Sequence, residues 1–245
     1  MEAVAAILAG GEGRRLRPYT DLIPKPMIPV GPEEKPVLEH IVEWIARHGV
    51  RDIVLLVGYK WRYIRNYFRD GAGLGARIRY SVDTPEYRGT GGALLQAYRR
   101  GLLRNPTLVW YGDILAALNP LDLLKTHEEK RSHATLAIAT RYQVPVGVAE
   151  MGEDGRITGL REKPELSINA TIGILAVDPS VLDEAEQKLG RNFDIMAGLI
   201  PYMIERGYRV YAYIYNGPWI DVGSMERYAK LDPDRLAEIL NPENT

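Results

Sequence analysis

The chain has 245 residues, with 31 Lys and Arg residues against 32 Asp and Glu residues, a formal net charge of -1. This balance argues against a general nucleic-acid or membrane-surface binder, since such proteins usually carry a basic excess. Hydrophobic residues make up 46% of the chain and charged residues 26%, which excludes disordered and collagen-like classes. Cysteine is absent, so thiol nucleophiles, thiolate metal sites and disulfides are excluded together.

The first residues lack the pattern of a signal peptide, because their apolar run is short and no basic residue precedes it. No apolar stretch approaches the length of a membrane span. We therefore expect a cytoplasmic protein with no membrane partner and no nucleic-acid partner. We find no linker, low-complexity segment or internal repeat, so we expect a single domain over residues 1–245.

The first half of the chain alternates apolar runs with helix-like segments. The predicted strands are Val4–Leu8, Ile53–Val57, Ile78–Val82, Thr107–Trp110 and Thr135–Thr140. The predicted helices are Val37–His48, Trp61–Phe68, Ala93–Leu103 and Leu121–Glu129. Strand and helix in alternation predict an α/β fold with a parallel sheet.

The second half changes character. Val146–Glu150 and Ile157–Leu160 flank a Glu-Asp-Gly turn and read as a hairpin. The remaining predicted elements are the strands Ile172–Val177 and Val210–Tyr215 and the helices Val181–Leu189, Ile195–Glu205 and Met225–Leu240. We expect a mixed sheet with a small accessory β region.

A glycine-rich loop follows the first predicted strand, with glycines at Gly10, Gly11 and Gly13. Glycine permits positive φ and lets backbone N–H groups approach a phosphate chain closely. Arg15 adds a planar fork of donors that suits phosphate oxygens. Downstream, prolines on both sides of Lys25 restrict the backbone and would hold its charge in place. We interpret the segment as a phosphate-binding loop.

Two familiar nucleotide motifs do not fit this loop. A dinucleotide fingerprint needs a third glycine where the chain has Leu16, and no P-loop sequence occurs. Leu16 therefore disfavours a nicotinamide oxidoreductase. The plainer alternative is a flexible strand-to-helix turn with solvated arginines.

The sequence resembles the sugar nucleotidyltransferases, or sugar-nucleotide pyrophosphorylases. Their signature G-G-x-G-x-R-L-x-P-x-T is matched by residues 10–20 and the following P-K-P-M by residues 24–27. The resemblance continues through Gly89-Thr90-Gly91-Gly92, Gly112-Asp113, Glu162-Lys163-Pro164 and Trp219-Ile220-Asp221-Val222-Gly223. It is closest to guanylyltransferases of the mannose and manno-heptose type.

This resemblance implies a Rossmann-like, mixed and mainly parallel sheet flanked by helices, as in the glycosyltransferase-A type. It implies a nucleotide-binding half over residues 1–141, a sugar-binding half over 142–223 and a C-terminal helix over 224–245. The implied reaction is the Mg²⁺-dependent transfer of a nucleoside monophosphate from a nucleoside triphosphate to a sugar 1-phosphate, giving a nucleotide-sugar and pyrophosphate. Because the sugar phosphate supplies its own nucleophile, the protein must position two polyanions and neutralise their repulsion.

The resemblance also assigns roles to residues. The implied catalytic residues are Arg15, Lys25 and Lys163. The implied nucleotide-binding residues are Leu8, Ala9, Gly10, Gly11, Gly13, Asp83, Gly89 and Thr90.

Asp113 and Asp221 are the candidate magnesium ligands. Asp113 follows an apolar predicted strand, at the strand end where open α/β sheets bind ligands. Asp221 stands between apolar residues, where a carboxylate is usually solvated, paired or metal-bound. The plainer reading makes Asp113 a turn residue. In the family these positions hold Mg²⁺, which prefers oxygen ligands.

The implied sugar-binding residues are Gly147, Glu162, Lys163 and Thr171. Glu162 would contact sugar hydroxyls and Lys163 the sugar phosphate, although the pair could also be a surface ion pair of little energetic worth. Two departures from the family fall here, because the residue before Gly147 is Val where relatives often have Tyr, and Thr171 replaces the usual Asn. The sugar therefore stays unassigned.

Asp83 bears on the choice of base. A carboxylate only accepts hydrogen bonds, and it can bridge the adjacent N1–H and 2-amino donors of guanine. Relatives that use uracil or thymine usually have Gln here, since an amide both donates and accepts. We therefore favour GTP and then CTP, while Asp83 could also simply start a turn.

Other readings stay open. The chain could be a thymidylyl-, uridylyl- or cytidylyltransferase acting on glucose 1-phosphate, or a non-catalytic sugar-nucleotide-binding regulatory subunit. The second is disfavoured because Arg15, Lys25, Asp113 and Asp221 are all present. Tyr111 replaces an Asn that is common in relatives, with no assigned role. Relatives commonly assemble, so a homo-oligomer is possible.

Overall fold

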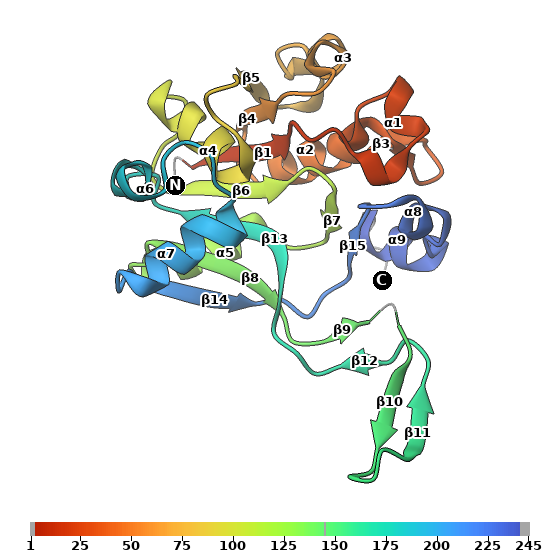
Figure 1. Ribbon diagram of the computed structural model, residues 1–245. Coiled ribbons are helices and arrows are strands. Elements are labelled where there is room, and N and C mark those ends of the chain that lie inside the picture. Colours follow the sequence, from red (N-terminus) through yellow and green to blue (C-terminus); the bar gives the residue numbers. More distant parts are fainter. Residues whose placement is uncertain (1–2, 145, 241–245) are drawn as a thin grey trace.

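A computed structural model describes residues 3–144 and 146–240. Its centre is a seven-stranded sheet (Figure 1). The strand order is β14 (Val210–Ile214), β8 (Ala134–Ala139), β13 (Ala170–Val177), β6 (Thr107–Tyr111), β1 (Val4–Ala9), β4 (Asp52–Val57) and β5 (Arg77–Val82).

Only β13 runs antiparallel to its neighbours β6 and β8, while every other pair in this sheet is parallel. The predicted mixed, mainly parallel sheet is therefore confirmed. Leu8 near the end of β1 pairs with Leu56 of β4 and with Tyr111 of β6. The carboxyl ends of these strands therefore meet at one edge of the sheet, and the loops that follow them lie side by side.

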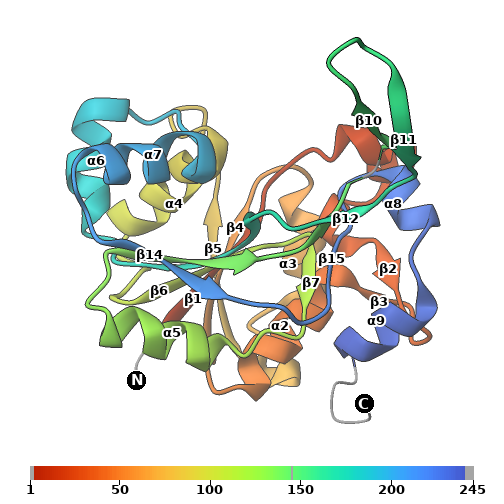
Figure 2. The same ribbon diagram turned by 90° about the horizontal axis from the view of Figure 1, so that it is seen from below.

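Helices cover both faces of the sheet (Figure 2). One face packs against α2 (Val37–Arg47) and α5 (Pro120–Glu129), and the other against α4 (Gly89–Arg99), α6 (Val181–Leu189) and α7 (Ile200–Glu205). The strands are apolar on both sides for this reason. In β4, Leu55 belongs to the first core and Leu56 to the second, and both are buried.

Shorter elements complete the described chain. Four two-stranded pairs are β2 (Pro29–Val30) with β3 (Lys35–Pro36), β7 (Ile114–Ala116) with β15 (Trp219–Asp221), β9 (Tyr142–Gln143) with β12 (Glu165–Leu166), and β10 (Val148–Met151) with β11 (Ile157–Arg161). The predicted hairpin is the antiparallel pair β10–β11, which projects from the body in both views (Figures 1 and 2). The remaining helices are α1 (Tyr19–Leu22), α3 (Trp61–Phe68), α8 (Met225–Ala229) and α9 (Pro233–Leu240). Three short 3-10 segments are η1 (Arg14–Leu16), η2 (Lys25–Met27) and η3 (Ala72–Leu74), and the π-helix η4 (Ile195–Leu199) leads into α7.

Two predicted helices need correction. The helix predicted to start at Ala93 begins four residues earlier, at Gly89, because the loop after α6 packs on its glycines: a Cβ on Gly91 would collide with the Phe193 ring. The single C-terminal helix is wrong, because α8 ends at Ala229 and α9 starts at Pro233. Proline lacks an N–H and disfavours helix in the preceding residue.

Residues 241–245 of that predicted segment, like Met1, Glu2 and Pro145, lie outside the described residues. Within the described ranges, no helix combines the length and the apolar character needed to cross a bilayer.

Candidate active site

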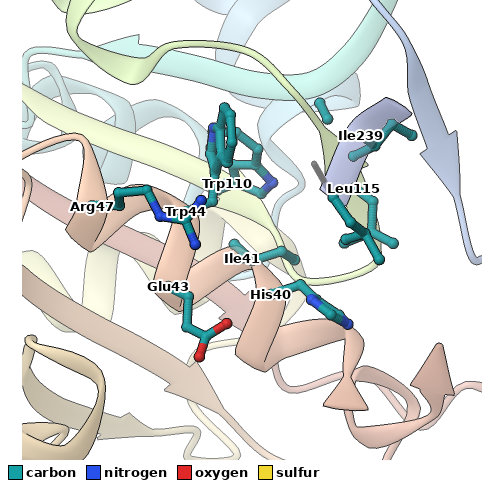
Figure 3. A pocket seen from close by; sticks show the side chains of 10 residues that line it. His40, Ile41, Glu43, Trp44, Arg47, Trp110, Leu115 and Ile239 are labelled. Carbon is teal, nitrogen blue, oxygen red and sulfur yellow. The ribbon is translucent and has the colours of Figure 1, made fainter. Parts of the chain in front are cut away.

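A small cavity lies beside α2, β7 and α9, away from the predicted site residues (Figure 3). It holds about 40 Å³, which is room for water but not for a nucleotide. The two indole N–H groups at its wall are already bonded, Trp44 to the carbonyl of Leu118 at 2.7 Å and Trp110 to that of Ile114 at 2.8 Å. Because both indole N–H groups have partners and the cavity is small, we do not assign it a ligand.

A larger cavity of about 400 Å³ opens at the carboxyl edge of the sheet. Residues from the glycine loop, η2 and the strand ends line it: Leu8, Ala9, Gly10, Gly11, Glu12, Lys25, Pro26, Leu56, Asp83, Gly89, Thr90, Ala93, Tyr111, Gly112, Asp113 and Asp194. Seven of the eight predicted nucleotide-binding residues are among them, and Gly13 is not. The predicted nucleotide segments therefore converge on one cavity.

Gly13 serves the turn itself. Its φ of +63° is left-handed, and a Cβ there would press against Lys25 and Thr20. The Thr20 hydroxyl donates to the Gly13 carbonyl at 3.0 Å. Gly13 thus shapes the loop that carries Arg15 and brings it against the segment that carries Lys25.

Asp83 directly follows β5, and its carboxylate lies against two backbones. A Cβ on Gly10 or on Gly58 would collide with an Asp83 oxygen. Burial raises the pKa of Asp83 to about 6, an effect that the charge of Arg100 opposes. Its Oδ1 atom is buried with no hydrogen-bond partner in the protein. A buried acceptor without a partner in a residue that lines a cavity calls for an explanation, and a ligand donor is one candidate partner.

Gly58 was not among the predicted residues. A sequence signal for it exists, because it directly follows the predicted strand Ile53–Val57, as Gly10 directly follows β1. The reason that this position must be a glycine is seen only in the structure, where the Asp83 carboxylate occupies the space of a side chain.

Lys25 and Asp113 form an ion pair in the wall of the same cavity. Lys25 is on η2 and Asp113 follows β6, and their side chains are 15% and 23% exposed. A pair so shielded from water is screened less than a surface pair. The predicted catalytic lysine and the first predicted metal ligand are therefore direct partners.

Asp221 lies next to Asp113, because β15 pairs with β7 and the Val222 N–H donates to the Asp113 carbonyl at 2.9 Å. Burial and then the Asp113 charge raise the pKa of Asp221, while Arg227, Lys25 and Arg15 oppose that rise. One Asp221 oxygen is paired with Arg227, and the other is buried without a hydrogen-bond partner.

Two adjacent carboxylates with an unpartnered buried oxygen fit a hard divalent cation. Among residues 3–144 and 146–240, no group of three or more Asp, Glu, His or Cys side chains forms that could hold a metal ion. Water and substrate oxygens would therefore complete the shell around Asp113 and Asp221, as Mg²⁺ commonly requires.

The N-terminus of α4 also lines the cavity. Asp194 Oδ1 accepts hydrogen bonds from the N–H and the hydroxyl of Thr90, at 3.0 and 3.2 Å. The Thr90 hydroxyl also accepts from the Ile195 N–H at 2.8 Å. Asp194 was missed from the sequence, because it is 104 residues from Thr90 and belongs to no motif that we recognised.

Tyr111 packs on Gly173 of β13, where a Cβ would come within 3.2 Å of the ring. Gly173 has a φ of +76°, and the β13 register shifts across β8 between Thr171 and Leu175. Tyr111 therefore fills the space that this irregular segment leaves and forms one side of the cavity.

The predicted sugar-binding residues lie apart from the cavity. Lys163 is 43% exposed and pairs with Glu162 at 3.7 Å, and Glu162 also lies beside Gly147. Thr171 is exposed on β13. The structure brings Gly147, Glu162 and Lys163 together. None of these three residues, nor Thr171, lines the cavity.

Comparison with known proteins identifies the family of the chain. A family model described as nucleotidyl transferase matches residues 4–238. A UTP–glucose-1-phosphate uridylyltransferase from Synechocystis is 33% identical over 240 residues, with 91% of this chain and 61% of the relative covered. A mannose-1-phosphate guanylyltransferase from Mycobacterium tuberculosis is 32% identical over 243 residues, with 96% and 65% covered. The chain thus spans less than two thirds of the length of these relatives.

Solved structures share the fold. HddC from Yersinia pseudotuberculosis, complexed with GMP-PN, superposes with a TM-score of 0.72 at 22% identity, with 96% of this chain and 99% of that chain covered. With the family match over almost the entire sequence, these findings show that the chain belongs to the nucleotidyl transferase family.

Proposed function

We propose that the chain catalyses Mg²⁺-dependent transfer of a nucleoside monophosphate, from GTP by preference, to a sugar 1-phosphate. The observation that carries the proposal is the single cavity in which the glycine loop, Lys25, Asp83 and Asp113 meet, with Asp221 beside it. The family match supports the reaction class. Because the chain covers 61–65% of the relatives named above, their activity is proposed for it by analogy.

The proposed reaction needs no activated side chain. A phosphate oxygen of the sugar 1-phosphate attacks the α-phosphorus of the nucleotide, the bond from that phosphorus to the bridging oxygen breaks, and pyrophosphate leaves with the electron pair. The loop N–H groups of Gly10 and Gly11 would bind phosphate oxygens, and Arg15 and Lys25 would offset their charge. Magnesium held by Asp113 and Asp221 would neutralise phosphate charge.

The proposed base is guanine because of Asp83. Asp83 lines the cavity and its buried Oδ1 has no partner in the protein, so an ionised carboxylate that turns toward a bound base would accept from N1–H and the 2-amino group of guanine. The relatives do not decide the base, since the two named above use UTP and guanylyl groups.

For the sugar half we propose that Glu162 binds sugar hydroxyls, Lys163 binds the sugar phosphate, and the Gly147 backbone and Thr171 border the sugar. The closeness of Gly147 to Glu162 supports this grouping. We also propose that residues 1–141 form a nucleotide-binding half and residues 142–223 a sugar-binding half. A cytoplasmic location and a homo-oligomer remain expectations.

The test is a direct assay. The chain is incubated with Mg²⁺, each nucleoside triphosphate and a panel of sugar 1-phosphates, and both pyrophosphate and nucleotide-sugar are measured. We expect turnover with GTP above the other nucleotides, and weaker use of ITP, whose base lacks the 2-amino group. Absence of product with every pair would favour a non-catalytic binding protein, and preference for UTP or dTTP would refute the guanine assignment.

The metal assignment has its own variants. Asp113→Asn and Asp221→Asn should each lose activity by about 100-fold or more, since each removes a charge that orients the polyanions. Asp122→Asn, an exposed aspartate in the first turn of α5, is the matched control and should keep full turnover. Full activity in either site variant would remove that residue from the metal site.

A further inference from the structure

Arg227 lies where the two halves of the candidate site meet, although no motif pointed to it. It is on α8, and its guanidinium is paired with Asp221. Its Nη2 atom lies 3.4 Å from the hydroxyl oxygen of Tyr142 on β9. The Arg227 side chain is 41% exposed, so it can be reached by a ligand.

The surroundings of Arg227 continue into the sugar half. Gln143, next to Tyr142, donates to the carbonyl of Lys163 at 3.2 Å. Lys163 also lies near enough to Glu226 to contribute, after the larger effect of Lys230, to lowering the pKa of that carboxyl. Arg227 therefore stands between the Asp113–Asp221 pair on one side and the segment of Lys163 on the other.

The Arg227–Asp221 pair is poorly suited to be permanent. Asp221 already has a second oxygen buried without a partner, and it neighbours another carboxylate. A divalent cation shared by Asp113 and Asp221 would compete with the Arg227 guanidinium for the negative charge of the Asp221 carboxylate. Arg227 would then need another anion, and a planar guanidinium binds two phosphate oxygens at once.

We propose that Arg227 is a substrate-binding residue that pairs with Asp221 in the free chain and moves to the phosphate of the sugar 1-phosphate when that substrate binds. This inference rests on the proposed function for the identity of its substrate. It adds to Lys163 a second cation for the sugar phosphate, from an element that follows the second metal aspartate. It also assigns Asp221 two successive partners.

The first test is metal binding without substrate. Mn²⁺ is titrated into the free chain, and free Mn²⁺ is followed by its EPR signal. Arg227→Gln should bind Mn²⁺ about 2- to 5-fold more tightly than the unchanged chain. The variant lacks the Arg227–Asp221 ion pair, and a partly exposed ion pair contributes at most about 1 kcal/mol. Equal or weaker Mn²⁺ binding would overturn the competition for Asp221.

The second test is sugar phosphate binding. With Mn²⁺ present, mannose 1-phosphate and glucose 1-phosphate are titrated calorimetrically, and KM values are measured where turnover occurs. Arg227→Gln should weaken sugar phosphate binding about 10- to 100-fold, the value of a lost charged hydrogen bond, and leave the KM for the nucleotide unchanged. Arg227→Lys keeps the positive charge but lacks the planar guanidinium. Its affinity for the sugar phosphate should therefore lie between those of the unchanged chain and of Arg227→Gln.

Lys230→Gln is the matched control, because Lys230 pairs with Glu226 in the same region and makes no ion pair with Asp221. It should match the unchanged chain in both titrations. Unchanged sugar phosphate affinity in Arg227→Gln, or no binding of either sugar phosphate to the unchanged chain, would overturn the phosphate role. A chain that binds sugar phosphate through Arg227 but forms no product would refute the proposed catalysis alone.

Discussion

Lys25 and Asp113 form an ion pair across 88 residues of sequence and join the proline-framed segment to the end of β6. Both are candidate site residues, and in the free chain each neutralises the other. Binding a metal and a triphosphate would change the partners of both. The same contact therefore links the stability of the free protein to the chemistry proposed for it.

Lys25→Gln should separate these two effects. The substitution leaves Asp113 beside Asp221 with no lysine partner, so we expect a loss of about 2 kcal/mol in unfolding free energy, below the 3–5 kcal/mol of a fully buried pair. Added Mg²⁺ should restore part of the loss, since a cation that binds only the folded chain stabilises it. Thermal unfolding with and without Mg²⁺ measures both.

Turnover in Lys25→Gln should fall about 100- to 1000-fold, as for loss of one preorganised donor to a transition state. Lys35→Gln is the control, because Lys35 also pairs with carboxylates but lies outside the cavity. A Lys25 variant that keeps turnover would make the pair purely structural.

The sequence predicted the elements of the central sheet well because their signals are local. β4 and β6 are apolar on both faces, and a buried strand needs little else to be recognised. The glycine loop was equally readable, since backbone approach to a ligand requires glycine at fixed positions. The start of α4 could not be predicted, because its signal is not local. Gly-Thr-Gly-Gly is a poor helix former, and contacts from residues 191–194 stabilise this first turn.

The partners of the site residues could not be predicted in the same way. Asp194 meets Thr90, and Arg227 meets Tyr142, only because the sheet brings distant loops to one edge. Nothing in the local sequence of Asp194 distinguishes it from a surface aspartate. Likewise, only the tertiary contact with Asp83 explains why position 58 is a glycine.

Asp83→Asn should make the protein more stable at neutral pH. The folded carboxyl has a pKa of about 6 against an ordinary 3.8, so the folded state holds its proton more tightly than the unfolded state. Stability present below pH 4 is therefore lost as the pH rises to 6. Asn does not ionise, so the variant should exceed the unchanged chain by about 1–3 kcal/mol at pH 7.5 and match it near pH 4, as urea unfolding would measure.

The same titration should alter base choice. Above pH 6 the ionised carboxylate accepts two hydrogen bonds, as guanine requires. Below pH 6 the protonated carboxyl donates one and accepts one, which resembles an amide and suits uracil. The ratio of GTP to UTP affinity should therefore rise between pH 5 and pH 7.5. A ratio that does not change with pH, or one that changes equally in Asp83→Asn, would remove Asp83 from base recognition.

Gly58→Ala tests the contact behind Asp83. The added methyl would collide with the Asp83 carboxylate and press on the Gly10 carbonyl, so the glycine loop must shift. We expect a loss of about 1–3 kcal/mol in stability, as for overpacking, together with weaker nucleotide binding. Gly73→Ala is the control, since open space surrounds its Cα and its stability should not fall. Unimpaired nucleotide binding in Gly58→Ala would show that the loop does not depend on this contact.

Asp194→Ala tests whether the α4 N-terminus is positioned for the nucleotide. The variant loses the acceptor for the Thr90 N–H and hydroxyl, so it should be destabilised by about 0.5–2 kcal/mol, as other caps are. Asn119→Ala removes the cap of α5, where the Asn119 side chain accepts from the Leu121 N–H at 2.9 Å, and should cost a similar amount. Only Asp194→Ala should raise the KM for the nucleotide, because Asp194 and Thr90 line the cavity and Asn119 does not. Asp194→Asn keeps an acceptor oxygen and should restore most of the affinity. Equal KM values in the two alanine variants would reduce Asp194 to a helix cap, whereas a rise confined to Asp194→Ala would make its contact with Thr90 part of the nucleotide site.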